Sequence, residues 1–171
     1  MRRLTLIAAL SALAMPAFAD DAALLMGVDR YEELRRISNA DDVLNGADSL
    51  RDAGYDVSTL SNGSSVEMAR QLQRFAVDAE GADRLVVGLA GRFVTDGDRT
   101  WLLAADAPRP TLFGMGAAVS IDSVLQVLAQ SPGQAVLVLG YDQDANSAIG
   151  DYLRQGVGSL DIPQGLSLIH I

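Results

Sequence analysis

Short apolar runs that alternate with segments of helical periodicity are the feature that most restricts the fold of this chain. Three runs, 22–28, 84–90 and 135–139, are almost continuously apolar, which is typical of strands buried on both faces. A further strand is predicted over 55–60, and stretches of helical length separate these strands. Strands joined by helices form βαβ units. The order therefore predicts one α/β domain, a three-layer αβα sandwich around a mostly parallel sheet, truncated at its C-terminal edge.

Serine caps mark the starts of the predicted helices. Ser38 and Ser64 each stand three residues before an acidic residue, the pattern of a capping box. Ser120 predicts the start of a third helix. A weaker helix is predicted over 144–155, and the Asp-Gly pair within 95–99 predicts a hairpin turn.

Residues 1–19 form the three-part pattern of a secretory signal peptide. Arg2 and Arg3 give a basic start, an apolar run follows, and Ala17-Phe18-Ala19 is a small-x-small cleavage site. The apolar run is too short to span a bilayer. We therefore expect the mature chain to be exported to a bacterial periplasm or beyond, with no membrane span left after cleavage. A buried N-terminal helix is the alternative.

Residues 166–171, LSLIHI, resemble the in-frame translation of a transposon end that is ligated to DNA fragments during library preparation. This resemblance predicts that the tail is not native and that the α/β domain, residues 20–165, is incomplete, with a C-terminal domain missing. The alternative is a short apolar terminal strand. Under the first interpretation the only histidine, His170, is foreign to the protein.

The charge and the rare residue types exclude several classes of function. The chain has 13 basic residues against 22 acidic ones, a net charge of −9, and loss of Arg2 and Arg3 would change this to −9 − 2 = −11. Nucleic acids and anionic membranes bind basic patches, so neither is an expected partner. With no cysteine and one histidine, the chain lacks disulfides, thiolate metal sites and cysteine nucleophiles. We expect no metal and no cofactor.

A ligand site is expected where the parallel strands end at their carboxyl side. Arg92 and Asp142 follow two adjacent predicted strands, so we predict a salt bridge between them. The residues expected to line a groove at this edge are Asp29, Tyr31, Arg92, Gly140, Tyr141 and Asp142.

Five segments, taken in order, resemble the bacterial caspase-like and metacaspase-like cysteine peptidases. They extend from residue 23 to about 155 and read ALLMGVDRYEEL, SNADDVLNGADSLRDAGYDV, LVVGLAGRF, DGDRTWLLAADA and AVLVLGYDQ. The resemblance implies a caspase-like fold with a peptide groove beside the strand ends. In that family a histidine after the third strand acts as the base, and a cysteine after the fourth attacks the peptide carbonyl.

Both catalytic positions implied by the resemblance hold other residues. Arg92 stands at the histidine position and Asp142 at the cysteine position. Gly140 stands where an acidic residue helps to select a basic substrate side chain. A cysteine peptidase needs a thiolate and a base beside the scissile bond, and the chain offers neither. The sequence therefore predicts a catalytically inactive domain with no catalytic residue.

The expected function is that of a recognition or scaffold module that grips an extended peptide or a protein. Two alternatives stay open. The family resemblance by itself implies a cysteine-type endopeptidase, which thiol reagents would inhibit. A flavodoxin-like small-ligand-binding domain would instead retain a nucleotide or a flavin and would have a different strand order.

Overall fold

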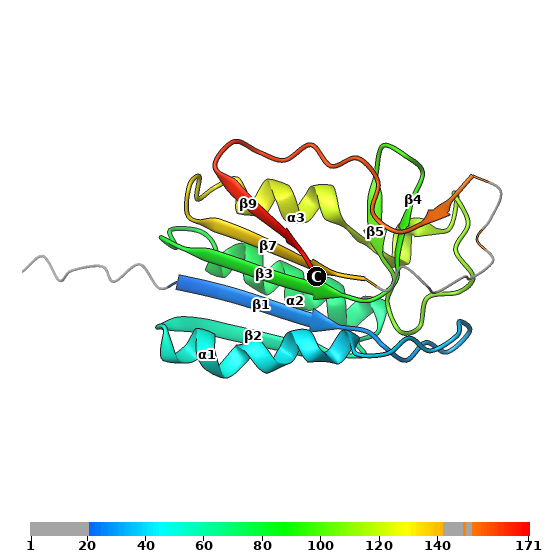
Figure 1. Ribbon diagram of the computed structural model, residues 1–171, viewed down its shortest axis with the longest axis horizontal. Helices are drawn as coiled ribbons and strands as arrows, with labels where there is room; N and C mark the ends of the chain where they lie inside the picture. The colour runs from blue at the N-terminus through cyan, green and yellow to red at the C-terminus, as the bar shows by residue number, and fades with distance from the viewer. Residues whose placement is uncertain (1–20, 142–148, 150–151) are drawn as a thin grey trace, which may run out of the picture.

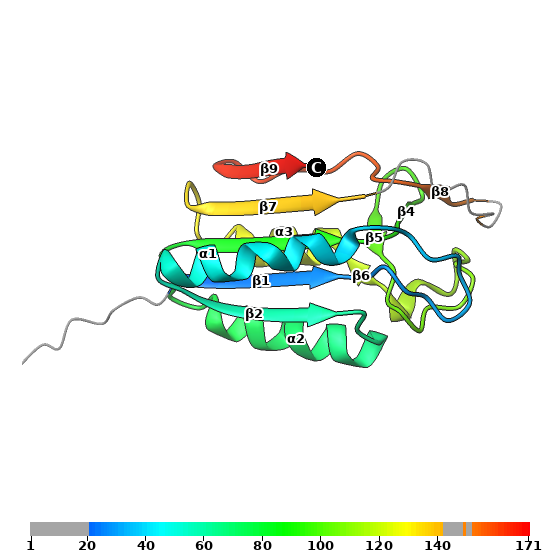
Figure 2. The same cartoon turned by 60° about the horizontal axis from the view of Figure 1, so that its bottom comes forward.

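A five-stranded parallel sheet forms the centre of the protein (Figures 1 and 2). The computed structural model describes residues 21–141, 149 and 152–171. The strand order is β2-β1-β3-β7-β9, and every neighbouring pair is parallel. The bounds are β1 (Asp21–Gly27), β2 (Tyr55–Ser61), β3 (Leu85–Ala90), β7 (Ala135–Gly140) and β9 (Leu166–His170).

Helices cover both faces of this sheet (Figure 2). On one face the 3-10 helix η1 (Ala40–Gly46) continues into α1 (Ala47–Asp52). On the other face lie α2 (Ser65–Asp78) and α3 (Ile121–Leu128), and the main core forms between them and the strands. Leu24, Met26 and Leu89 are fully buried in this core. The predicted three-layer αβα sandwich is confirmed.

A small antiparallel sheet lies beyond the carboxyl ends of the main strands (Figure 1). Its order is β6-β5-β4-β8, and the short 3-10 helix η2 precedes β6. The predicted hairpin is present between β4 and β5, with Gly97 in the left-handed region at φ 110°. The bounds are β4 (Phe93–Thr95), β5 (Thr100–Leu102), η2 (Met115–Ala117), β6 (Val119–Ser120) and β8 (Arg154–Gln155).

One of the two predicted capping boxes is confirmed and the other is wrong. Ser64 caps α2 with a complete capping box. At η1 the N-cap is Asn39, which has a left-handed φ of 67° and no side-chain cap bond. The carboxylate of Asp41 accepts hydrogen bonds from Ser61 and Asn62 instead. Tertiary partners at the end of β2 therefore replace the local cap that Ser38 predicted.

The C-terminal part of the chain differs from the expected helix. Residues 154 and 155, the end of the helix predicted over 144–155, form β8 because the edge of β4 offers them backbone partners. Most of the rest of that predicted helix, residues 144–148, 150 and 151, lies outside the described residues. Residues 166–170 form β9 beside β7, as in the alternative of a short apolar strand. The foreign origin of 166–171 stays a prediction.

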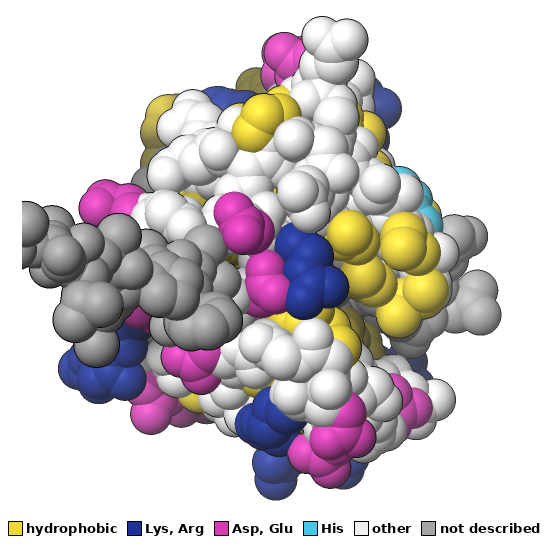
Figure 3. Space-filling model, turned by 90° about the vertical axis from the view of Figure 1, so that its left-hand side faces the viewer, with side chains coloured by type: hydrophobic (Ala, Val, Ile, Leu, Met, Phe, Trp, Pro, Cys, Tyr) yellow, Lys and Arg dark blue, Asp and Glu magenta, His cyan; other side chains and the backbone are white. Residues whose placement is uncertain are grey.

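The sheet ends in an uncharged strand. Within residues 21–141, 149 and 152–171, β9 has a strand neighbour on one side only, and neither β7 nor β9 carries an acidic residue, an arginine or a lysine. Figure 3 shows hydrophobic side chains gathered beside the histidine of β9. The side chain of Ile169 is among the exposed hydrophobic ones, at 47%. None of the helices among the described residues has the length and hydropathy needed to cross a membrane.

An ion pair at the amino end of the sheet makes stability depend on pH. Arg84 donates hydrogen bonds to Asp21, and these chiefly hold the pKa of the Asp21 carboxyl below its usual range, although burial opposes them. The unfolded chain has the ordinary aspartate pKa of about 3.9, so the folded state binds the Asp21 proton less tightly. This contribution to stability is present above about pH 4 and is lost as the pH falls through the folded pKa.

We expect the stability advantage of the wild type over Asp21→Asn to shrink as the pH is lowered from about 5 to about 2. Urea unfolding of both proteins across this range measures the difference. An advantage that stayed constant over the whole range would contradict the role of this pair.

Candidate functional site

The ends of β1, β3 and β7 meet at the carboxyl edge of the main sheet. The backbone N–H of Val28 donates to Ala90 O at 2.9 Å, and the N–H of Gly91 donates to Gly140 O at 3.0 Å. These bonds extend the pairing of three strands past their last residues. The segments that the sequence singled out therefore begin side by side, although Asp142 and its predicted salt bridge with Arg92 lie outside the described residues.

Arg92, at the position of the family's histidine, is buried and points toward the loop before η1. Its Nε donates to Arg35 O at 3.2 Å, and Nη2 donates to the same oxygen. The guanidinium carbon lies 5.5 Å from the centre of the Tyr31 ring, within reach of a cation–π contact. Since a guanidinium stays protonated, Arg92 cannot act as a base here.

Tyr31 fixes the backbone on both sides of Arg92. Its hydroxyl donates to Val28 O at 3.0 Å and accepts from the N–H of Arg92 at 2.8 Å. Burial raises the pKa of Tyr31, so the hydroxyl remains protonated and keeps donating. Gly91 makes room for this contact, because a Cβ there would lie 2.9 Å from the Tyr31 hydroxyl.

Asp29 serves the loop rather than an open groove. It is 5% exposed, and its Oδ2 accepts from Nη2 of Arg36 at 2.8 Å. Its Oδ1 lies 3.5 Å from Nε of Arg30 and has no hydrogen-bond partner among the described residues. Both arginine side chains are mostly exposed, so their pairing with Asp29 closes the loop from the solvent side.

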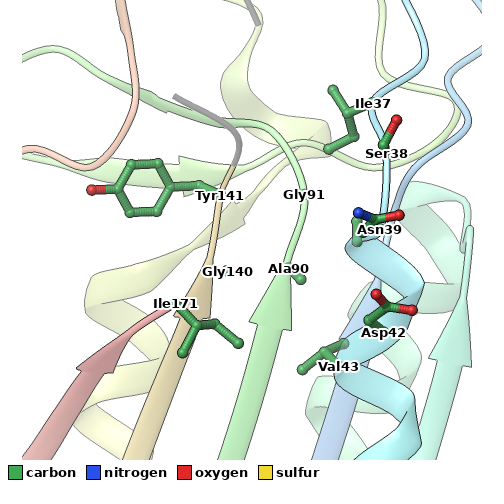
Figure 4. A pocket seen from close by; sticks show the side chains of 11 residues that line it. Ile37, Ser38, Asn39, Asp42, Val43, Ala90, Gly91, Gly140, Tyr141 and Ile171 are labelled. Atoms are coloured by element: carbon green, nitrogen blue, oxygen red, sulfur yellow. The ribbon is translucent and has the colours of Figure 1, made fainter. Parts of the chain in front are cut away.

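A pocket of about 490 Å³ opens at this edge (Figure 4). Of the expected groove residues, Gly140 and Tyr141 line it, whereas Asp29, Tyr31 and Arg92 lie outside its lining. The lining side chains come from the loop before η1, from η1 itself and from the ends of β3, β7 and β9. They are Ile37, Ser38, Asn39, Ala40, Asp42, Val43, Ala90, Gly91, Gly140, Tyr141 and Ile171.

Of the described residues in the lining, Asp42 carries the charge, and it was not among the residues predicted from the sequence. Figure 4 shows it on the same side of the pocket as Ser38 and Asn39. The apolar wall is formed by Ile37, Val43 and other aliphatic groups. A helix that follows the first strand begins at the carboxyl edge of the sheet. This rule is the sequence signal by which Asp42 could have been found.

The described lining of the pocket combines one carboxylate with apolar walls. The chain has no cysteine, and its one histidine, His170, contacts the Tyr141 ring edge-on at 5.9 Å between centroids. Among the described residues no group of three or more acidic or histidine side chains is placed to hold a metal ion. An anionic carboxylate beside apolar walls favours a cationic group on an aliphatic stem.

Comparisons with known proteins agree on one fold. Residues 20–138 match a family model described as the caspase domain. The solved Drosophila initiator caspase Dronc is 12% identical with a TM-score of 0.53, and the match covers 78% of this chain and 53% of that one. A protein of Geobacter sulfurreducens, GSU0716, is 14% identical with a TM-score of 0.51, over 72% of this chain and 50% of that one.

A further solved structure, pro-sf-caspase-1, is 19% identical with a TM-score of 0.52, over 78% of this chain and 55% of that one. This chain thus spans about half the length of the structures that it resembles. No curated protein matches the sequence. At sequence identities below 20%, the similarity to these solved structures shows the fold alone.

Proposed function

The chain belongs to the caspase domain family, and from that premise we propose that it is an exported, catalytically inactive member that binds an extended peptide at the carboxyl edge of its main sheet. One observation carries the proposal. The residue at the position of the family's histidine is Arg92, and its guanidinium is bound to Arg35 O and to the Tyr31 ring. Together with the lack of any cysteine, this leaves a peptide-binding fold without the nucleophile and the base of a cysteine peptidase.

The ligand that best fits the pocket is a peptide with a basic side chain. Asp42 supplies a carboxylate at the pocket wall, while Ile37 and Val43 offer apolar surface for the methylene groups of an arginine or lysine. Asp42 is exposed to solvent, so its pairing with a cation contributes modestly. Asp42 is therefore expected to make the pocket prefer a basic side chain over an uncharged one of similar size. Much of the affinity for the peptide is expected to come from apolar contacts and backbone hydrogen bonds.

Binding of matched peptides tests this function. We expect an acetylated tripeptide amide ending in arginine to bind about threefold more tightly than the same peptide ending in norleucine. Asp42→Asn is expected to remove this ratio, because the amide lacks the charge. Calorimetric titration gives both dissociation constants. Equal binding of the two peptides to the wild type, or hydrolysis of either one, would contradict the proposal.

Export rests on residues 1–19 and has its own test. When the whole chain is produced in a bacterial host, we expect the periplasmic protein to begin at Asp20, because signal peptidase cleaves after small residues. N-terminal sequencing of the periplasmic fraction measures this. A large side chain at Ala17 or Ala19 is expected to block cleavage, and a cytoplasmic protein that still begins at Met1 would argue against export.

A further inference from the structure

Asn62 joins three segments of the chain that meet at the end of β2. It follows β2 directly and has a left-handed φ of 51°. Its Oδ1 accepts from the backbone N–H groups of Asp29 at 3.1 Å and Arg30 at 2.8 Å. Its Nδ2 donates to Oδ2 of Asp41 at 3.2 Å and to Oγ of Ser61 at 2.8 Å. One carboxamide thereby connects the end of β2 to the loop after β1 and to the first turn of η1.

Asp41 is the residue through which this connection reaches the pocket. Both of its carboxylate oxygens lie 3.1 Å from the Ser61 hydroxyl, and Oδ2 also accepts from Asn62. Its two chain neighbours, Ala40 and Asp42, line the pocket. The position of the Asp41 side chain therefore fixes the backbone on which Asp42 is carried.

The backbone of this turn also rests directly on β1. A Cβ at Gly27 would lie 2.6 Å from Ala40 O and 2.9 Å from the Cα of Asp41. The first turn of η1 is thus in close contact with β1, and its Asp41 side chain is hydrogen-bonded to the end of β2. A short 3-10 helix has weak internal hydrogen bonding, so such external contacts determine where it lies.

We propose that Asn62 is a positioning residue of the pocket, which holds Asp41 and thereby keeps Asp42 directed at a bound basic side chain. The inference rests on the proposed peptide-binding function. Position 62 needs an acceptor for the N–H groups of Asp29 and Arg30 and a donor for the Asp41 carboxylate. The carboxamide of asparagine supplies both. An aspartate at position 62 would keep the acceptors but would set a second carboxylate against Asp41, which like charges disfavour.

An exchange of the two side chains separates positioning from general stability. Asn62→Asp removes the donor and is expected to lower the norleucine-to-arginine ratio of dissociation constants from about three to near one. In the double variant Asp41→Asn with Asn62→Asp, the new amide at 41 donates to the new carboxylate at 62. That carboxylate still accepts from Asp29 and Arg30, so the ratio is expected to return toward the wild-type value. Gln130→Glu, an added charge on an exposed residue beyond α3, is the matched control.

Hydrogen exchange provides a measurement that does not depend on the peptides. The backbone amides of residues 40–46 are expected to exchange hydrogen faster in Asn62→Asp than in the wild type. In the double variant Asp41→Asn with Asn62→Asp, their exchange is expected to slow again. Two results would overturn the inference. One is that Asn62→Asp keeps both the peptide selectivity and the hydrogen-exchange protection of the wild type. The other is that the double variant folds but regains neither. A third result is that the wild type shows no peptide selectivity, while amide protection is lost in Asn62→Asp and restored in the double variant. This result would overturn the proposed function and the role of Asp42, and it would leave the Asn62–Asp41 contact established.

Discussion

Alanine in place of Gly91 is expected to destabilise the protein by about 2–3 kcal/mol. A Cβ at this position would lie 2.9 Å from both the Tyr31 hydroxyl and Cδ1 of Leu102, and 3.1 Å from Val28 O. Gly91 has a backbone φ of 154°, which residues other than glycine rarely adopt. Relief would require the half-buried Tyr31 or the end of β1 to move, which breaks the hydrogen bonds of the Tyr31 hydroxyl to Val28 and Arg92.

Urea unfolding of Gly91→Ala against the wild type measures this loss. Gly46→Ala is the matched control, because Gly46 has a helical φ of −72° and open space where its Cβ would be. The control is expected to be neutral or slightly stabilising. Equal unfolding midpoints for the two variants would show that the close approach of Tyr31 to Gly91 is not required.

Removal of the Arg92 side chain has the second large expected effect. Arg92→Ala is expected to cost about 2 kcal/mol, because it leaves the oxygen of Arg35 without these donors and opens space around a residue that is 5% exposed. Arg92→Lys retains a charge and a donor and is expected to lose less. The Tyr31 contact through the backbone N–H of Arg92 persists in both variants.

Thermal or urea unfolding of the two variants gives the order of stability. Arg109→Ala removes an exposed arginine from the loop after β5 and is expected to change stability by less than about 0.5 kcal/mol. If Arg92→Ala were as mild as this control, the arginine would be a solvated residue rather than the anchor of the loop before η1.

Local patterns predicted the parallel sheet well because each strand carries its own signal. The apolar runs of β1 and β3 are buried on both faces and that of β7 is buried on one face and half-buried on the other, so no other part of the chain is needed to recognise them. The cap at Ser64 is equally local, since both of its bonds lie within one turn. Fold class and the carboxyl edge as the place of the site followed from these signals.

Features that depend on distant partners were missed. The turn at Ser38 resembled the one at Ser64, yet Asp41 bonds to residues some twenty positions away. Residues 154 and 155 pair with β4 although their surroundings have a helical pattern. Asp42 was overlooked as a pocket residue for the same reason, because its place depends on how η1 is tied to β1 and β2. No pattern within a single segment encodes such contacts.

In the described part of the chain no strand pairs with the outer side of β9, and this edge bears on how copies of the chain associate. An edge strand offers free backbone donors and acceptors to any chain that approaches it, and β9 has no charged side chain to keep a second copy away. The chain as a whole has a net charge of −9, which acts at longer range as mutual repulsion that salt screens. We therefore expect low salt to keep copies of this chain dispersed and high salt to promote their association through the uncharged edge.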